Sequence, residues 1–305
     1  MKKRGKNSWF SIAVKIAVSA LIIFFLFRIA DFKALSESIK GMNIWLFLLS
    51  AALIYPGMLL RAIRFKLIIN KEGFSISTND SFKLALIGSA LNIFMPASTG
   101  DFAKAYYGYK RHRIKEEMIS ASIVDKIIAL LSLFIISGIS SLIFRMTSFF
   151  LISLFCLLMC SAVVFFPRIL PWKILNKFLA ALKRNKLDEK KLVKTFTLDS
   201  GLKLRTILLS IAGWIVTYSQ LYLICIAYSA DVSFFYLLAV SSLFMLARLF
   251  PLTLNGIGST EAMVAYLFGL IGIGFEAAVA ISLTNTIVSL IIPGIAGFFV
   301  ILAEK

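Results

Sequence analysis

The chain has 305 residues, of which 60% are hydrophobic and 16% are charged, whereas a soluble domain is roughly 45–50% apolar and about 25% charged. This composition excludes a water-soluble fold of this length. It also excludes a disordered chain, because the 28 Phe residues and the long apolar runs cannot stay solvated. The net charge of +18 would suggest nucleic acid for a soluble protein. In a membrane protein, basic cytoplasmic loops account for it, so we expect a polytopic membrane protein with no nucleic-acid partner.

The first two apolar segments predict transmembrane crossings, which need about 20 residues each. Residues 9–30 follow a basic N-terminus and are too long for a signal peptide, so we interpret them as an anchor. Residues 44–60 form the second predicted crossing. Arg61 and Arg64 follow it directly, and we expect both side chains to lie near the helix end, where they can reach inner-leaflet phosphates.

The next apolar run is interrupted before it can cross. It covers residues 82–95 and stops at Pro96 and Gly100. Basic clusters flank the segment on both sides, so the positive-inside rule places both ends in the cytoplasm. The pattern predicts a re-entrant broken hairpin.

Crossings resume at residues 119–144 and 148–166, followed by a strongly basic cytoplasmic loop at 167–205 and a crossing at 206–228. A second broken hairpin over residues 229–274 is interrupted at Pro251, Gly256 and Gly258. Arg248 is its single basic residue, which places both of its ends outside. Residues 277–302 then return the C-terminus to the cytoplasm.

These segments predict an all-α polytopic membrane protein with six full transmembrane helices and two re-entrant hairpins. The order span, span, broken hairpin, span occurs twice with opposite orientation, over residues 9–144 and 148–302. We expect residues 1–305 to form one membrane domain built as an inverted-topology repeat. The expected location is the cell membrane, with both termini cytoplasmic.

Paired interrupted helices are the strongest sequence pointer to a transporter binding site. Lipid cannot satisfy the backbone groups that a break releases, so such breaks lie in protein-lined or wet cavities. Half-helices starting near Gly100 and Gly258 would direct positive N-terminal ends at a bound anion. Ionisable groups at membrane depth usually mark function or pair with each other, and the candidates here are Asp101, Lys104, Asp125, Lys126, Arg248 and Glu261.

Two interpretations of these charges remain open. Lys104 and Arg248 could hold a lipid phosphate, with Glu261 as the partner that holds Arg248 when the site is empty. The alternative is purely structural pairing, for example between Asp125 and Lys104 or Arg61, with no substrate contact.

The surrounding motifs resemble the lysylphosphatidylglycerol synthase transmembrane region family, also called the flippase-like family. The resemblance covers essentially the whole chain and rests on residues 59–68, 90–107, 124–127 and 247–263. The family pattern has Arg-x-x-Arg, then Asn-x-x-x-Pro-x-x-x-Gly-(Glu/Asp), then Pro-x-x-x-x-Gly-x-Gly-x-x-Glu. The matching positions are Arg61 and Arg64; Asn92, Pro96, Gly100 and Asp101; and Pro251, Gly256, Gly258 and Glu261. The chain departs from the family at Asp125-Lys126, often Glu-Arg, and at Asn285, often Arg.

The resemblance implies a lipid-binding membrane module. In the best-known relatives this module is fused to an aminoacyltransferase domain and is thought to move the product lipid across the bilayer. This chain ends at Lys305 without a soluble domain, so we expect no lysyl transfer and no enzyme activity. No Walker-type loop or metal-ligand spacing occurs, and we expect no cofactor.

Two functions are therefore compatible with the sequence. The first is a lipid translocase that moves an anionic or amphipathic lipid between leaflets. The second is a non-transporting membrane partner that docks or supplies lipid to a separate lipid-modifying or glycosyl transferase.

Overall fold

The computed structural model describes residues 4–95, 100, 116–166, 193–195, 197–249, 253 and 255–303 of the chain. These residues form helices and no strand, which confirms the all-α prediction. Large apolar side chains cover the outside of the bundle, among them Phe155, Leu208 and Phe299. Such a surface suits lipid and not water.

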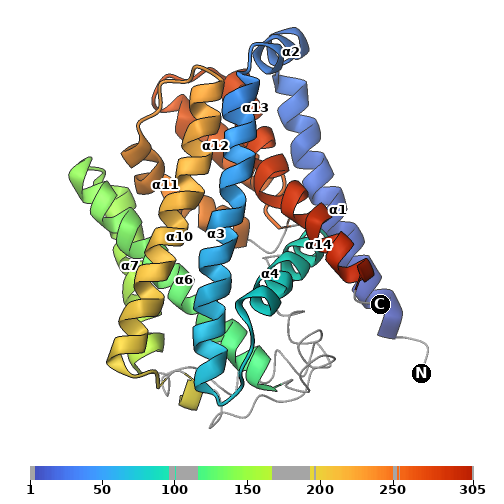
Figure 1. Ribbon diagram of the computed structural model, residues 1–305. Helices are drawn as coiled ribbons and strands as arrows, with labels where there is room; N and C mark the ends of the chain where they lie inside the picture. Colours follow the sequence, from blue (N-terminus) through green and yellow to red (C-terminus); the bar gives the residue numbers. More distant parts are fainter. Residues whose placement is uncertain are drawn as a thin grey trace.

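The helices run in the order shown in Figure 1. The first half contains α1 (Arg4–Ile29), α2 (Phe32–Lys40), α3 (Ile44–Lys71), α4 (Thr78–Asn92) and α6 (Glu116–Ile143). The second half contains α7 (Thr147–Phe165), α10 (Ser200–Ala227), α11 (Phe234–Leu249), α12 (Ser259–Gly269), α13 (Phe275–Thr286), the π-helix η3 (Ile287–Ile291) and α14 (Ile292–Ala303).

Within the described residues, five helices are long and apolar enough to cross a membrane: Ile44–Lys71, Glu117–Ile143, Thr147–Phe165, Ser200–Ala227 and Phe275–Ala303. They correspond to five of the six predicted crossings. The remaining one lies in α1, which is 26 residues long and whose described side chains include the apolar stretch Ile16–Ile29. The start of α1 and the end of α14 lie at the same end of the bundle, and α2 lies at the opposite end (Figure 1).

Side-chain caps explain where several helices begin. The Asp31 and Asn43 side chains each accept hydrogen bonds from two backbone N–H groups at the starts of α2 and α3. Ser77 and Asp199 do the same with one N–H each at the starts of α4 and α10. These residues satisfy N–H groups that a helix start leaves without a backbone partner. The polar first turn of α4 is the reason the helix begins before the apolar run at residue 82.

The predicted end of the second crossing near residue 60 is wrong. Helix α3 continues for three more turns to Lys71. Arg61 and Arg64 therefore lie inside the helix and not at its end. Arg64 is buried, with only 3% of its surface exposed, so it does not reach for lipid phosphates. An ion pair with α6, described below, compensates its charge.

The last crossing is also not one regular helix. It is divided into α13, the π-helix η3 and α14. Pro293 is the second residue after the π-helix and has no N–H to donate to the Ser289 carbonyl one turn earlier. The Ile292 N–H bonds instead to the carbonyl of Ile287, five residues back. The proline thus explains the wider turn.

Helices α4 and α14 cross with their backbones in very close contact. A Cβ added at Gly297 would lie 1.9 Å from the Leu86 carbonyl oxygen, and one at Gly294 would lie 2.4 Å from the Ile93 side chain. Small residues allow such approaches in membrane bundles, where apolar burial gives no driving force between helices. This crossing positions α4 beside the π-helix.

A group of buried serines joins α6, α7 and α11, and we call Ser137, Ser141, Ser153 and Ser242 the serine cluster. The Ser137 hydroxyl lies 3.0 Å from the hydroxyls of both Ser153 and Ser242. Ser137 and Ser141 lie 2.7 and 3.1 Å from the Ala239 carbonyl oxygen. Each serine has a hydrogen-bond partner, so the cluster holds three helices together without leaving a polar group unsatisfied.

Candidate functional site

A cavity of about 140 Å³ lies between α3, α4, α6, α10, α11 and the π-helix, and we call it the first cavity. It could hold several water molecules or a small polar group, since one water needs about 10–15 Å³. Its described charged lining consists of Arg61, Arg64, Asp125, Lys126 and Arg248. Five of the ionisable residues singled out in the sequence thus surround one space.

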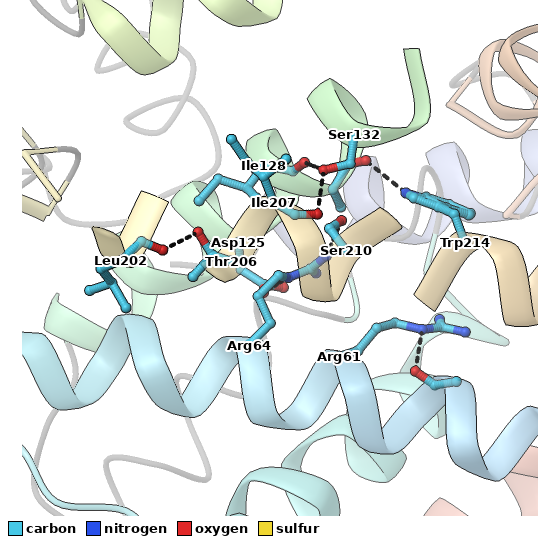
Figure 2. A network of polar contacts seen from close by, with 12 residues as sticks. Arg61, Arg64, Asp125, Ile128, Ser132, Leu202, Thr206, Ile207, Ser210 and Trp214 are labelled. Carbon is cyan, nitrogen blue, oxygen red and sulfur yellow. Dashed lines mark hydrogen bonds and ion pairs between the residues drawn. The ribbon is translucent and has the colours of Figure 1, made fainter. Parts of the chain in front are cut away.

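Arg64 and Asp125 both line this cavity and form a buried ion pair (Figure 2). The Arg64 Nε atom lies 2.7 Å from Asp125 Oδ1, and its Nη1 donates to the Ser210 hydroxyl at 2.6 Å. The interaction therefore joins α3, α6 and α10. Asp125 pairs with Arg64, a partner that the sequence reasoning did not name, whereas its expected alternative partner Lys104 lies outside the described residues. The two partners lie 61 residues apart in sequence.

Arg61 lies one turn before Arg64 on α3 (Figure 2). Its guanidinium donates to the Gly57 carbonyl at 3.4 Å and to the Thr217 hydroxyl at 3.5 Å. Both distances are at the long end of hydrogen bonding. Trp214, on the same face of α10, is fixed by a 2.8 Å bond from its indole N–H to the Ala129 carbonyl. The Arg61 guanidinium therefore lies against the face of α10 on which the Trp214 side chain is fixed.

A second cavity of about 70 Å³ adjoins the first. The two share part of their lining, including Trp214, Thr217, Arg248 and Asn255. Along α10, the first cavity is lined by residues from Ser210 to Thr217 and the second by residues from Trp214 to Leu221. Their spacing of three or four residues forms a continuous stripe on one helix face. The two cavities therefore follow one another along α10.

The break between α11 and α12 borders both cavities through Asn255. Gly256 and Gly258 have φ angles of +85° and +92°, which side chains other than glycine rarely adopt. A Cβ at Gly256 would also lie 2.7 Å from the Thr260 hydroxyl and 2.9 Å from the Arg248 Cα. The glycines thus allow the chain to turn sharply next to Arg248, as the motif predicts.

Glu261 is completely buried at the start of α12. Its carboxylate accepts the Gly258 backbone N–H at 2.6 Å and the Thr286 hydroxyl at 2.7 Å. The expected partnership of Glu261 with Arg248 is therefore wrong. A carboxylate at the third position of a helix stabilises the positive N-terminal end. Glu261 fixes the break and ties α12 to α13.

The first interrupted segment also reaches the first cavity, through Asn92 at the end of α4. Gly100 packs directly on this turn, since a Cβ there would lie 2.5 Å from the Asn92 backbone nitrogen. Asn92 and Asn255, one from each interrupted segment, thus line the same space. Four other predicted site residues lie outside the described part of the chain: Pro96, Asp101, Lys104 and Pro251.

Several lining residues were missed by the sequence reasoning. Ser210, Trp214 and Thr217 on α10 carry no motif, and only their spacing along one face could have indicated them. Ser81 is 1% exposed and lines the first cavity, and its hydroxyl has no hydrogen-bond partner among the residues that the structure describes. Ser289 lies in the π-helix and lines both cavities. Pro293 is the sequence feature that could have indicated this irregular turn.

The lining of the first cavity offers cationic and hydroxyl hydrogen-bond donors to a ligand. Among the residues that the structure describes, no three His, Cys, Asp or Glu side chains come together as a metal site. What the site can do chemically is to bind an anionic group between α3, α4, α6 and α10.

Comparison with known proteins identifies the family of the chain. The model of the family described as "Lysylphosphatidylglycerol synthase TM region" matches residues 12–297. A relative, the UPF0104 membrane protein MJ1595 of Methanocaldococcus jannaschii, is 25% identical over 267 residues, which cover 79% of this chain and 80% of the relative. The resemblance seen in the motifs is confirmed along nearly the full chain.

Proposed function

Because this chain belongs to the lysylphosphatidylglycerol synthase TM region family, we propose that it is an integral membrane lipid translocase. In this proposal it moves an anionic or amphipathic lipid between the leaflets of the cell membrane and does not change the lipid chemically. The headgroup passes along the two cavities while the acyl chains stay in the bilayer.

The stripe on α10 is the observation that carries this proposal. From Ser210 to Leu221 it spans 11 helical steps, or about 16 Å at 1.5 Å per residue. This length is roughly half of the 30 Å hydrocarbon core. Polar side chains at Ser210 and Thr217 would be costly against lipid, whereas they are useful along a headgroup path.

The proposal includes an inverted repeat with cytoplasmic termini. It is supported by the meeting of the two interrupted segments at the first cavity through Asn92 and Asn255. Inverted repeats place broken helices on opposite sides of a shared site, and rocking of one repeat against the other gives alternating access. The basic clusters at residues 110–115 and 167–205 support the cytoplasmic assignment.

Transport by the purified chain in vesicles tests the proposal. The probe is a fluorescent phospholipid whose outer-leaflet fraction is bleached by dithionite. We expect wild-type protein to expose inner-leaflet probe and Gly213→Phe to abolish this, because Gly213 lines the first cavity and the ring fills it. Ile215→Phe is the matched control, since Ile215 lies two residues away on the same helix and is 42% exposed on the outer face.

Equal transport by Gly213→Phe and wild type would contradict the path along α10. If the wild-type chain moves no lipid but changes the activity of an added transferase, the docking function replaces the proposed one.

A further inference from the structure

We infer that the hydrogen bond between Arg64 and Ser210 closes the cytoplasmic end of the transport path, and that the outer end has no equivalent bond. We call this bond the inner latch. The resting protein is then closed inside and opens first to the outside. This inference rests on the proposed function for the path and for the orientation of the two halves.

Helices α3 and α10, which are counterparts in the proposed repeat, pack as a symmetric pair. Each has 28 residues, and they begin 200 − 44 = 156 positions apart. A Cβ at Gly57 would lie 3.4 Å from Val216, and one at Gly213 would lie 3.9 Å from Leu60. These two contacts are counterparts, because 57 + 156 = 213 and 60 + 156 = 216. A position on α3 therefore corresponds to the position 156 residues later on α10.

At the cytoplasmic end of this crossing, a short hydrogen bond joins the two halves. Arg64 of α3 donates from Nη1 to the Ser210 hydroxyl of α10 at 2.6 Å. Asp125, on α6 of the first half, holds the same guanidinium through Nε at 2.7 Å. All three side chains line the first cavity. Asp125 is therefore a positioning residue that orients Arg64 toward the second half.

At the outer end, the counterparts of these residues make no such bond. Arg64 corresponds to Gln220 (64 + 156 = 220), and Ser210 corresponds to Ile54 (210 − 156 = 54). Gln220 donates to Asn285 Oδ1 at 3.3 Å, a bond that stays within the second half. The Gln220 Oε1 atom is buried and has no hydrogen-bond partner in the described part of the chain. Ile54 is buried and apolar, so it cannot accept a hydrogen bond.

The two ends lie at equal distances from the crossing. Its midpoint on α3 falls at position 58.5, between the two contacts. Arg64 is 64 − 58.5 = 5.5 residues away, or about 8 Å at 1.5 Å per residue, and Gln220 is equally far on the opposite side. Separating the halves at the inner end breaks a charge-assisted hydrogen bond, which is roughly twice as strong as a neutral one. Separating them at the outer end breaks no described bond of Gln220, so the outer side opens more readily.

Cysteine modification from each side of the membrane tests the inner latch. The full chain carries Ser289→Cys, at a position that lines both cavities. Its native cysteines, Cys156, Cys160 and Cys225, are replaced by alanine. A charged, membrane-impermeant thiol reagent is applied to right-side-out and to inverted membrane vesicles, without added lipid. We expect modification from outside to be at least fivefold faster than modification from the cytoplasmic side.

Ser210→Ala removes the acceptor on α10 and keeps the pair of Arg64 with Asp125. We expect modification from the cytoplasmic side to become at least fivefold faster, while the rate from outside does not rise. Ser282→Ala is the matched control, since it removes a fully buried serine hydroxyl on α13 that lines neither cavity. It should change neither rate more than twofold.

A reciprocal variant builds the missing bond at the outer end. Ile54→Ser, Gln220→Arg and Asn285→Asp together copy the inner three residues, and we expect at least fivefold slower modification from outside. If this variant does not fold, as judged by its elution in detergent, a second exchange replaces it. Arg64→Gln with Asp125→Asn copies the outer amide pair to the inner end, and it should speed modification from the cytoplasmic side at least fivefold.

Equal rates from both sides without a further substitution, or equal increases from both sides in Ser210→Ala, would overturn the inference. A change in Ser282→Ala as large as that in Ser210→Ala would also overturn it. Side-specific changes without lipid transport by the same chains would leave the inner latch standing and contradict the proposed function. Lipid transport with the same sidedness of modification in every variant would do the reverse.

Discussion

The serine cluster and the first cavity are two polar regions inside the same apolar bundle, and α6 and α11 contribute to both. In the serine cluster, short hydroxyl contacts link Ser137, Ser153 and Ser242. No described lining residue of either cavity belongs to that cluster. In the first cavity, a charged pair stands beside further cations and a hydroxyl without a partner, Ser81.

This difference separates two uses of polar groups at membrane depth. Where each donor has a protein acceptor, the polar group holds helices together. Where a buried donor borders a space and lacks an acceptor, the structure has room for a ligand to supply one. The comparison predicts that removing a hydroxyl has opposite consequences in the two regions: Ser137→Ala in the serine cluster should lower stability and not transport, and Ser81→Ala at the cavity should lower transport and not stability.

The largest loss of stability should follow from Asp125→Ala, which leaves Arg64 buried without its carboxylate. Removing one partner of a buried pair typically costs about 3–5 kcal/mol. Unfolding of the purified protein in mixed detergent micelles would measure it. Asp231→Ala is the control, because Asp231 lies exposed in the turn before α11 and should change little.

A double substitution checks the physical reason. Arg64→Met with Asp125→Leu removes both charges and should recover most of the lost stability, since a desolvated pair can be replaced by apolar residues. Equal stability of Asp125→Ala and the Asp231→Ala control would show that the pair contributes nothing to the framework.

A smaller loss is expected for Ser137→Ala in the serine cluster. The substitution removes the bond to the Ala239 carbonyl and the contacts with two other hydroxyls. Hydrogen bonds between membrane helices contribute about 0.6 kcal/mol on average, so we expect a loss of about 1 kcal/mol. Lipid transport per folded protein should stay at the wild-type rate. A large transport defect with unchanged unfolding would contradict the structural role of the cluster.

The smallest effect on stability should come from Ser81→Ala. The hydroxyl makes no hydrogen bond within the described part of the chain, so its removal loses none there and also removes an unsatisfied buried group. We expect an unchanged or slightly increased stability in the same unfolding assay. A loss comparable to that of Ser137→Ala would show that the Ser81 hydroxyl has a structural partner.

Much of the helical framework could be predicted from the sequence, because apolar length and charge are local properties. The prediction failed where polar residues continue a helix. The basic residues after position 60 suggested a helix end, but α3 extends to Lys71 since Asp125 on another helix compensates Arg64. Such compensation depends on tertiary contact, which hydropathy does not contain.

The candidate site could also be predicted only in part, because the partners of its charged residues depend on tertiary contact. The motifs identified Arg61 and Asn92, and its charge at membrane depth identified Arg248; all three line the first cavity. The partners of the charges were not predictable, because Glu261 bonds to Gly258 and Thr286 and not to Arg248. The serines that distinguish the two regions were also missed. Serine is common in membrane helices, and its role depends on whether an acceptor lies opposite.

The most direct test of the account is lipid transport by Ser81→Ala and Ser137→Ala in matched vesicles, with equal amounts of folded protein and a phosphatidic acid probe. The account predicts that Ser81→Ala slows transport at least threefold, although its stability is unchanged. It predicts wild-type transport for Ser137→Ala, although its stability is lower. Equal transport by both variants, or a slower rate for Ser137→Ala, would contradict the assignment of the first cavity to the lipid and of the serine cluster to the framework.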